Sequence, residues 1–240
     1  MMFGLYVLLT LGALVVAGIA SRGGGKALWL ALLALGWTVS QFNTLLEAVV
    51  FSVMPLTNAL VQLAVSAIAF ALLAAIAVAV SGRWRRKEAA GARPALSWRN
   101  LALILCGYEL LYWTAGTFVW PFVAEFYADK PLPAVSLVAA LQVPRALIFV
   151  LAAWPWLRTN PRYAPMVLGL AYSVMGGIAP MFPDNPYMPP DVRLAHGIET
   201  SVSNFLFGIL VGYVLRPKRD ASSDDRAESA AEFESGAMGR

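Results

Sequence analysis

The sequence has very little of the side chains that carry metal or thiol chemistry. Among 240 residues there is one cysteine, Cys106, and one histidine, His196. A single cysteine cannot form an intramolecular disulfide, and a single histidine cannot supply a zinc site built from several histidines. A haem held by two histidines is excluded for the same reason. We therefore expect no metal centre and no cofactor.

Charged residues are also scarce. Asp, Glu, Lys and Arg make up 13% of the chain, whereas a soluble domain has about a quarter. Hydrophobic residues make up 59%, and the mean hydropathy is +0.66. This composition indicates an integral membrane protein, with the lipid bilayer as its surroundings. The net charge of +4 does not indicate nucleic-acid binding, because the basic residues lie between apolar segments and form no single stripe.

Seven apolar runs, separated by short polar breaks, are long enough to cross a bilayer as helices of roughly 20 residues. Helices satisfy every backbone amide within their own segment, as lipid requires. The sequence therefore predicts an all-α polytopic bundle of seven transmembrane helices. In the last run, Gly208 and Gly212 predict a close helix contact. The runs are Phe3–Ala20, Ala27 to about Val53, Leu56–Val80, Asn100 to about Val123, Ala134–Leu157, Ala164–Met181 and Val192–Leu215.

Lysine and arginine occur in every second break, after the first, third, fifth and seventh runs. Such residues resist translocation, so basic breaks face the cytoplasm. The alternation predicts an outside N-terminus, a cytoplasmic C-terminus and a multi-pass protein of a bacterial-type plasma membrane, the inner membrane. The residues concerned are Arg22, Lys26, Arg83, Arg85, Arg86, Lys87, Arg93, Arg99, Arg158, Arg162, Arg216, Lys218 and Arg219.

The two ends of the chain need separate interpretations. The first run ends in small residues, AGIAS, so a cleaved signal peptide is an alternative to a membrane span. Its start, MMFGLY, has no positive charge, however, and cleavage would leave Arg22 and Lys26 outside. Beyond residue 216 the composition becomes polar and small. We predict a transmembrane domain over residues 1–216 and a disordered cytoplasmic tail over residues 217–240.

Ionisable residues inside the predicted spans carry the functional hypothesis, because each costs on the order of 3 kcal/mol unless it faces protein, water or a partner. At 1.5 Å per residue, Glu47 and Glu199 both lie roughly 12 Å below the outer surface. His196 is shallower, and imidazole changes charge between about pH 5 and 8. Glu109 and Arg145 lie near the midplane. They form a candidate pair, although the sequence leaves open whether they meet.

Helical spacing indicates which polar residues share a face. If these faces point at one another, they line a polar site in the outward half of the bundle. Asn43, Ser203 and Asn204 would support it, although such side chains also serve as ordinary hydrogen bonds between helices. For Glu109 and Arg145, the alternative to a functional role is an ion pair that only stabilises the fold. The three faces are Ser40, Asn43 and Glu47; Glu109, Trp113 and Gly116; and His196, Glu199 and Ser203, with Asn204 adjoining.

Cys106, Arg145 and His196 follow the order in which the exosortase and archaeosortase family places Cys, Arg and His on successive membrane helices. This resemblance, limited to three residues, implies an intramembrane transpeptidase. The segment LCGYE departs from the family's Ala-Cys-Ser pattern. Predicted depths also separate the thiol from the imidazole by on the order of 15 Å. A thiol nucleophile needs its base within hydrogen-bond reach.

Three classes of function fit these observations. A small-solute or proton-linked transporter, which we favour, would use Glu47, Glu199 and His196 as titrating groups, with Glu109 and Arg145 at the midplane. An intramembrane enzyme acting on a lipid or lipid-linked substrate would place Arg145 on a phosphate or carboxylate. A non-catalytic subunit would use the same groups against another membrane protein or a second copy. The sequence names neither the ligand nor the partner, and leaves open whether the protein is an enzyme.

Overall fold

The structure is a computed structural model that describes residues 2–87, 93–185 and 188–216. Within these residues every regular element is helical, and seven helices are long and apolar enough to cross a membrane. The predicted fold class and number of spans are confirmed. The elements are α1 (Met2–Ala20), α2 (Gly25–Trp37), η1 (Thr38–Phe42), α3 (Asn43–Val50), α4 (Leu56–Val80), α5 (Trp98–Tyr127), α6 (Val135–Leu157), α7 (Ala164–Ser173), η2 (Val174–Ile178), η3 (Ala179–Met181) and α8 (Pro190–Val214).

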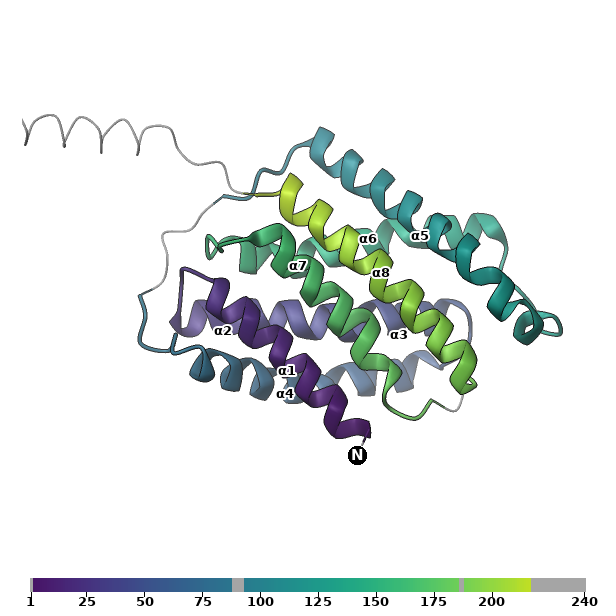
Figure 1. Cartoon of the computed structure of the whole chain (residues 1–240), viewed down its shortest axis with the longest axis horizontal. Coiled ribbons are helices and arrows are strands. Elements are labelled where there is room, and N and C mark those ends of the chain that lie inside the picture. The colour runs from purple at the N-terminus through teal and green to yellow at the C-terminus, as the bar shows by residue number, and fades with distance from the viewer. Residues whose placement is uncertain (1, 88–92, 186–187, 217–240) are drawn as a thin grey trace, which may run out of the picture.

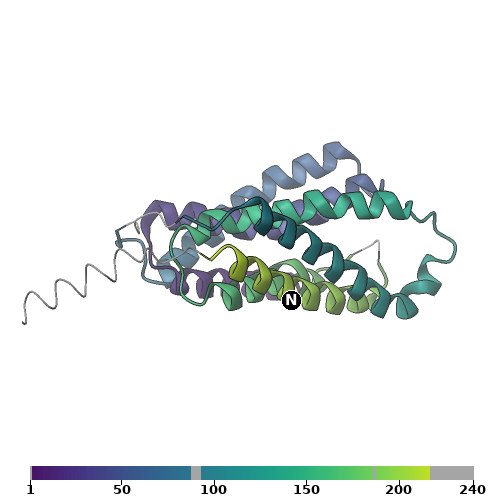
Figure 2. The ribbon, with the colours of Figure 1, turned by 90° about the horizontal axis from the view of Figure 1, so that it is seen from above.

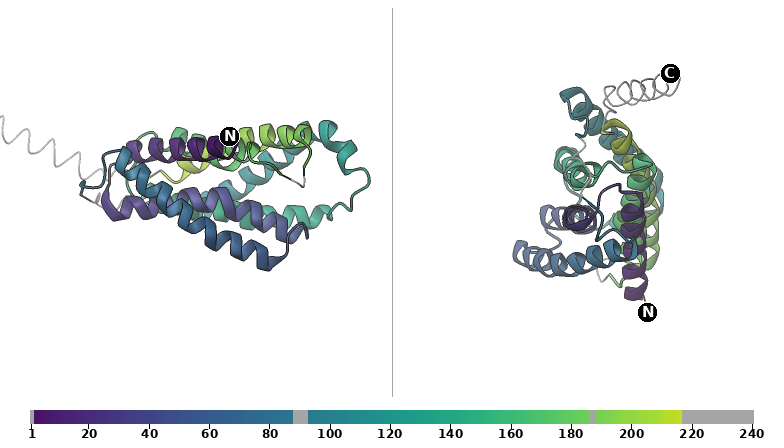
Figure 3. Two further views of the ribbon diagram at one scale, coloured as in Figure 1. Left: turned by 90° about the horizontal axis from the view of Figure 1, so that it is seen from below. Right: turned by 90° about the vertical axis from the view of Figure 1, so that its left-hand side faces the viewer.

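The helices form two layers (Figure 1). Helices α1, α7, α8 and α5 lie side by side in the front layer of this view, and α4, α2 and α6 lie behind them. The views from above and along the bundle show the same separation (Figures 2 and 3). Both edges are closed, because α1 contacts α4 and α5 contacts α6. Side chains between the layers are therefore enclosed by protein, whereas the outer faces expose large apolar residues such as Leu72, Phe118 and Phe122.

Small residues hold α7 and α8 together. A Cβ atom built on Gly208 would lie 2.5 Å from the Leu168 carbonyl oxygen, and one on Gly212 would lie 2.6 Å from the Pro165 Cα. Only glycine permits two backbones to approach this closely. The close helix contact predicted for these two glycines is confirmed, and α7 is its partner.

The second and sixth spans are not regular α-helices. Each contains a π-helical turn, η1 or η2, and these turns contact each other inside the bundle. The second span also ends at Val50, so its predicted end near Val53 was wrong. There Ser52 has φ of 58°, and the amide of Val53 donates to the Ala48 carbonyl at 2.8 Å, which reverses the chain. Glu47 therefore lies only about 5 Å from its helix end, shallower than predicted.

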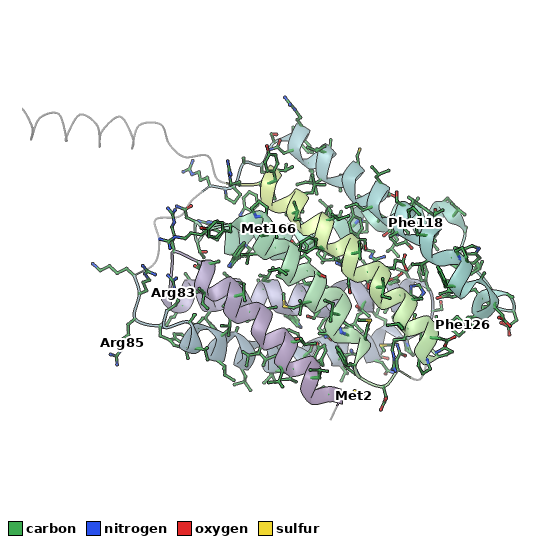
Figure 4. The ribbon with its side chains drawn as sticks, in the orientation of Figure 1. Met2, Arg83, Arg85, Phe118, Phe126 and Met166 are labelled. Atoms are coloured by element: carbon green, nitrogen blue, oxygen red, sulfur yellow. The ribbon has the colours of Figure 1, made fainter. Side chains whose placement is uncertain are left out.

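The basic breaks gather at one end of the bundle. The amide of Arg162 donates to the Ala20 carbonyl at 2.8 Å, and that of Gly25 donates to the Arg83 carbonyl at 2.9 Å. Figure 4 shows Arg83 and Arg85 at the end opposite Phe126. Gathering at one end agrees with the alternation of charge, while the side of the membrane that this end faces stays a prediction. The predicted tail, residues 217–240, lies outside the described residues.

Candidate functional site

Arg145 is a cation buried in the bundle interior. It lies on α6, and its Nη2 is 3.5 Å from Glu47 Oε2 on α3; the two side chains are 11% and 35% exposed. Nη1 donates to Gln142 Oε1, one turn earlier on α6, at 3.1 Å. Nε has no hydrogen-bond partner among the described residues. The Nε–H donor of Arg145 is thus unpaired in the bundle interior, where an unsatisfied donor costs folding free energy.

Two tyrosines of α5 cover this guanidinium. Its central carbon lies 6.0 Å from the Tyr108 ring centroid and 5.6 Å from that of Tyr112, within cation–π range. Tyr108 itself packs against Phe149 and Phe207 in the core. Sequence reasoning missed both tyrosines. Their spacing of one helical turn, facing a predicted buried arginine, was the available signal.

A second polar group lies at the start of α8. His196 Nδ1 is 2.9 Å from Glu199 Oε2, and His196 Nε2 is 3.1 Å from the Tyr127 hydroxyl at the end of α5. A carboxylate only accepts hydrogen bonds, so Nδ1 carries the proton when the ring is neutral. Nε2 then accepts from the tyrosine. The three side chains therefore form a directed hydrogen-bond chain from Tyr127 through the imidazole to Glu199.

These two groups belong to one charged cluster, which we define as Glu47, Arg145, His196 and Glu199. The Glu199 carboxylate interacts electrostatically with Arg145, and Glu47 interacts likewise with His196. Where α5 passes Glu199 it carries Gly116, whose Cβ position lies 3.6 Å from Glu199 Oε1. The pair from α3 and α6 and the pair from α8 are thus within electrostatic range of each other, and α5 lies against both through Tyr112 and Gly116.

Glu109 does not join the charged cluster. Its Oε2 accepts a hydrogen bond from Trp113 Nε1 of the same helix at 2.9 Å. The candidate pair of Glu109 with Arg145 does not form, because the acidic partner of Arg145 is Glu47. The reason is helical geometry. Tyr108 faces Arg145, and the next residue along a helix points about 100° away.

The three supporting residues differ in their surroundings. Ser203 Oγ donates to the backbone carbonyl of Glu199 at 2.8 Å, so it bonds its own helix. Asn204 is buried towards η2, with its Nδ2 only 2.8 Å from the Cβ position of Gly176. Asn43 is buried, and neither atom of its amide has a hydrogen-bond partner among the described residues. Asn43 is therefore the supporting residue with unused hydrogen-bonding capacity.

The resemblance to cysteine transpeptidases does not extend to geometry. Cys106 is an exposed free thiol near the start of α5. His196 contacts Tyr127 at the other end of the same helix, which is about 30 Å away at 1.5 Å per residue. A thiol and an imidazole so far apart cannot form a nucleophile–base pair. Cys106 and His196 therefore cannot form the nucleophile–base pair that a cysteine transpeptidase requires.

In comparisons with known proteins, no family model, no curated protein and no solved structure matches this chain. The chain is a seven-span integral membrane protein. Its function has to be argued from the charged cluster itself.

Proposed function

We propose that this protein is a proton-linked transporter of a small anionic solute in a bacterial-type plasma membrane. The observation that supports the proposal is that two different pairs of charged side chains lie within electrostatic range of each other in the bundle. His196 with Glu199 is suited to proton exchange, and Arg145 with Glu47 is suited to binding an anion. Charged groups at membrane depth that face the bundle interior usually belong to substrate or proton pathways.

The proton would move along the chain of Tyr127, His196 and Glu199. His196 lies about 9 Å of helix from the start of α8, near the predicted outer end. A proton accepted at Nε2 permits release of the Nδ1 proton to the carboxylate, because the two ring nitrogens exchange roles on protonation. Glu199 would then hold the proton within electrostatic reach of Arg145.

The solute would bind at Arg145. The distance of 3.5 Å to Glu47 is longer than the 2.7–2.9 Å usual for a charge-assisted hydrogen bond. Nε is unpaired, so the guanidinium can offer a two-donor edge to a carboxylate or phosphate. An arriving anion would replace Glu47 as the counter-charge. If a carboxylate of the cluster is protonated at the same time, the proton balances the negative charge of the anion and the net charge of the site stays the same. This balance couples proton movement to anion movement.

The test uses purified protein in proteoliposomes that contain a pH-sensitive dye. Succinate, lactate and inorganic phosphate are added outside, and internal acidification is followed. We expect one of these anions to drive acidification, with Glu199→Gln and Glu47→Gln abolishing it. Glu109→Gln is the matched control and should retain the flux, since Glu109 lies outside the charged cluster. Wild-type vesicles without anion-dependent flux, or equal loss in all three variants, would refute the proposal.

A further inference from the structure

A cavity of 680 Å³ has a lining that includes none of the four residues of the charged cluster. Its size falls within the range of about 300–1,000 Å³ typical of small-molecule sites. Helix α1 forms one wall, α4 a second, and the η1–α3 segment a third. The side chains that carry the argument are Tyr6, Ser40, Gln41, Asn58, Gln62 and Phe70.

The mouth of this cavity faces lipid. Phe3 of α1 and Val61 and Val65 of α4 line it, and their exposed fractions are 68%, 64% and 65%. Both helices lie at the edge of the bundle and expose apolar side chains along their length. In a membrane-spanning protein such a face is in contact with acyl chains. An occupant would therefore enter sideways from the bilayer.

The lining changes from polar to apolar along the bundle. Asn58 and Gln62 lie near the start of α4, whereas Ala69 and Phe70 lie deeper in the same helix. About 18 Å of helix separate Asn58 from Phe70, so the apolar end approaches the middle of the bilayer. This arrangement fits an amphiphile whose headgroup stays near the helix end and whose chain points inward.

The polar end of the lining offers hydrogen bonds without charge. Gln62 Nε2 donates to Gln41 Oε1, and Gln41 Nε2 donates to the Tyr6 hydroxyl, both at 3.4 Å. This chain leaves an acceptor at Gln62 Oε1 and a donor at the Tyr6 O–H. The buried Ser40 hydroxyl lies beside the Tyr6 hydroxyl.

Among the described residues that line the cavity, none has an acidic, basic or histidine side chain. A charged headgroup would lose its hydration there without gaining a counter-charge. The spare acceptor and donors instead match a headgroup with one hydroxyl and neighbouring carbonyl oxygens. An isoprenoid quinone, with carbonyl acceptors alone, would leave the Gln62 acceptor unused.

We propose that this cavity binds a diacylglycerol-type lipid, with its hydroxyl and ester carbonyls at Tyr6, Ser40 and Gln62 and one acyl chain towards Phe70. The site shares the η1–α3 segment with the charged cluster but none of its four residues. The inference is independent of the proposed transport function, and either one can fail alone.

The experiment compares two photoactivatable lipids with identical acyl chains, diacylglycerol and phosphatidylglycerol, at equal mole fraction in nanodiscs containing the full chain. Crosslinked residues are mapped by mass spectrometry. We expect diacylglycerol to label the cavity lining roughly tenfold more than phosphatidylglycerol, the effect of about 1.4 kcal/mol of preference. Unlabelled diacylglycerol should compete with this labelling.

Two cavity variants and one control make the result decisive. The double variant Gln41→Leu/Gln62→Leu removes the headgroup partners, and Ala69→Trp fills the deep end; each should reduce diacylglycerol labelling roughly tenfold. Glu199→Gln should leave labelling unchanged, even if it abolishes proton flux. Equal labelling by phosphatidylglycerol, undiminished labelling in both cavity variants, or displacement by an isoprenoid quinone in place of diacylglycerol would overturn the proposal.

Discussion

Glu47 of α3 and Arg145 of α6 form an ion pair that is asymmetric in burial, with side chains 35% and 11% exposed. The carboxylate is partly accessible, whereas the guanidinium is almost completely covered by protein. Arg145 therefore depends on its partner more than Glu47 does, because an uncompensated buried charge is the costly outcome when one partner is removed.

This asymmetry predicts the order of stability among three variants. Glu47→Gln should destabilise the protein by about 3 kcal/mol, at the lower end for breaking such a pair because Glu47 is partly exposed. Arg145→Met should cost less, since the remaining carboxylate is only partly buried. The double variant should be more stable than Glu47→Gln alone, because it buries no unpaired charge. Thermal unfolding in detergent micelles measures all three, and a double variant as unstable as the sum of the singles would contradict the pairing.

The single histidine makes the hydrogen-bond chain directly observable. In protein labelled with ¹⁵N-histidine, every imidazole signal belongs to His196. We expect Glu199→Gln to shift mainly the Nδ1 resonance and Tyr127→Phe mainly the Nε2 resonance, because each removes the partner of one nitrogen. Ser203→Ala should change neither, since that hydroxyl bonds a backbone carbonyl. Signals insensitive to both substitutions would show that the ring has other partners.

The contact of α7 with α8 predicts a strong effect of one added methyl group. Gly208→Ala places a Cβ where the Leu168 carbonyl lies, so the helices must separate, at a cost of about 1–3 kcal/mol. Gly12→Ala on α1 is the matched control, because nothing lies within 4 Å of its Cβ position. The two unfolding midpoints give the comparison. If Gly208→Ala is no less stable than Gly12→Ala, the helices are not in close contact.

The predicted orientation can be tested in a Cys106→Ser background, since Cys106 is an exposed thiol. Arg85→Cys and Asp129→Cys then place single thiols in exposed positions at the two ends of the bundle. A membrane-impermeant maleimide should label Asp129→Cys in intact cells and Arg85→Cys only after permeabilisation. The reverse pattern would put the charged cluster in the cytoplasmic half.

The spans were predictable because a helix that crosses the bilayer must have roughly 20 residues, most of them apolar. Leu56–Val80 and Ala164–Met181 agree with the structure residue for residue. The fourth span begins earlier than predicted, at Trp98, because the Ser97 side chain accepts from the Asn100 amide. Serine at this position is a known helix-start signal. The two π-helical turns have no comparable start signal in the sequence, and such turns are rare.

The charged cluster was predictable only in part. Spacing along each helix shows which residues share a face, and the structure brings Glu47, Arg145, His196 and Glu199 together. Spacing does not show which neighbour a face meets, so the sequence left the pairing of Glu109 with Arg145 open, and the structure pairs Arg145 with Glu47 instead. Tyr127 was missed because it lies beyond the predicted end of its helix, near Val123.

The π-helical turn Thr38–Phe42 contains more residues per turn than an α-helix and immediately precedes the segment that holds Glu47. Rewinding these five residues as an α-helix, which turns by about 100° per residue and so more than the π turn does, would rotate everything after them about the helix axis. The carboxylate would then point away from the guanidinium although no side chain in the cluster had been altered. The local winding of the backbone, as well as the identity of the acids, therefore sets the direction in which the carboxylate of Glu47 points.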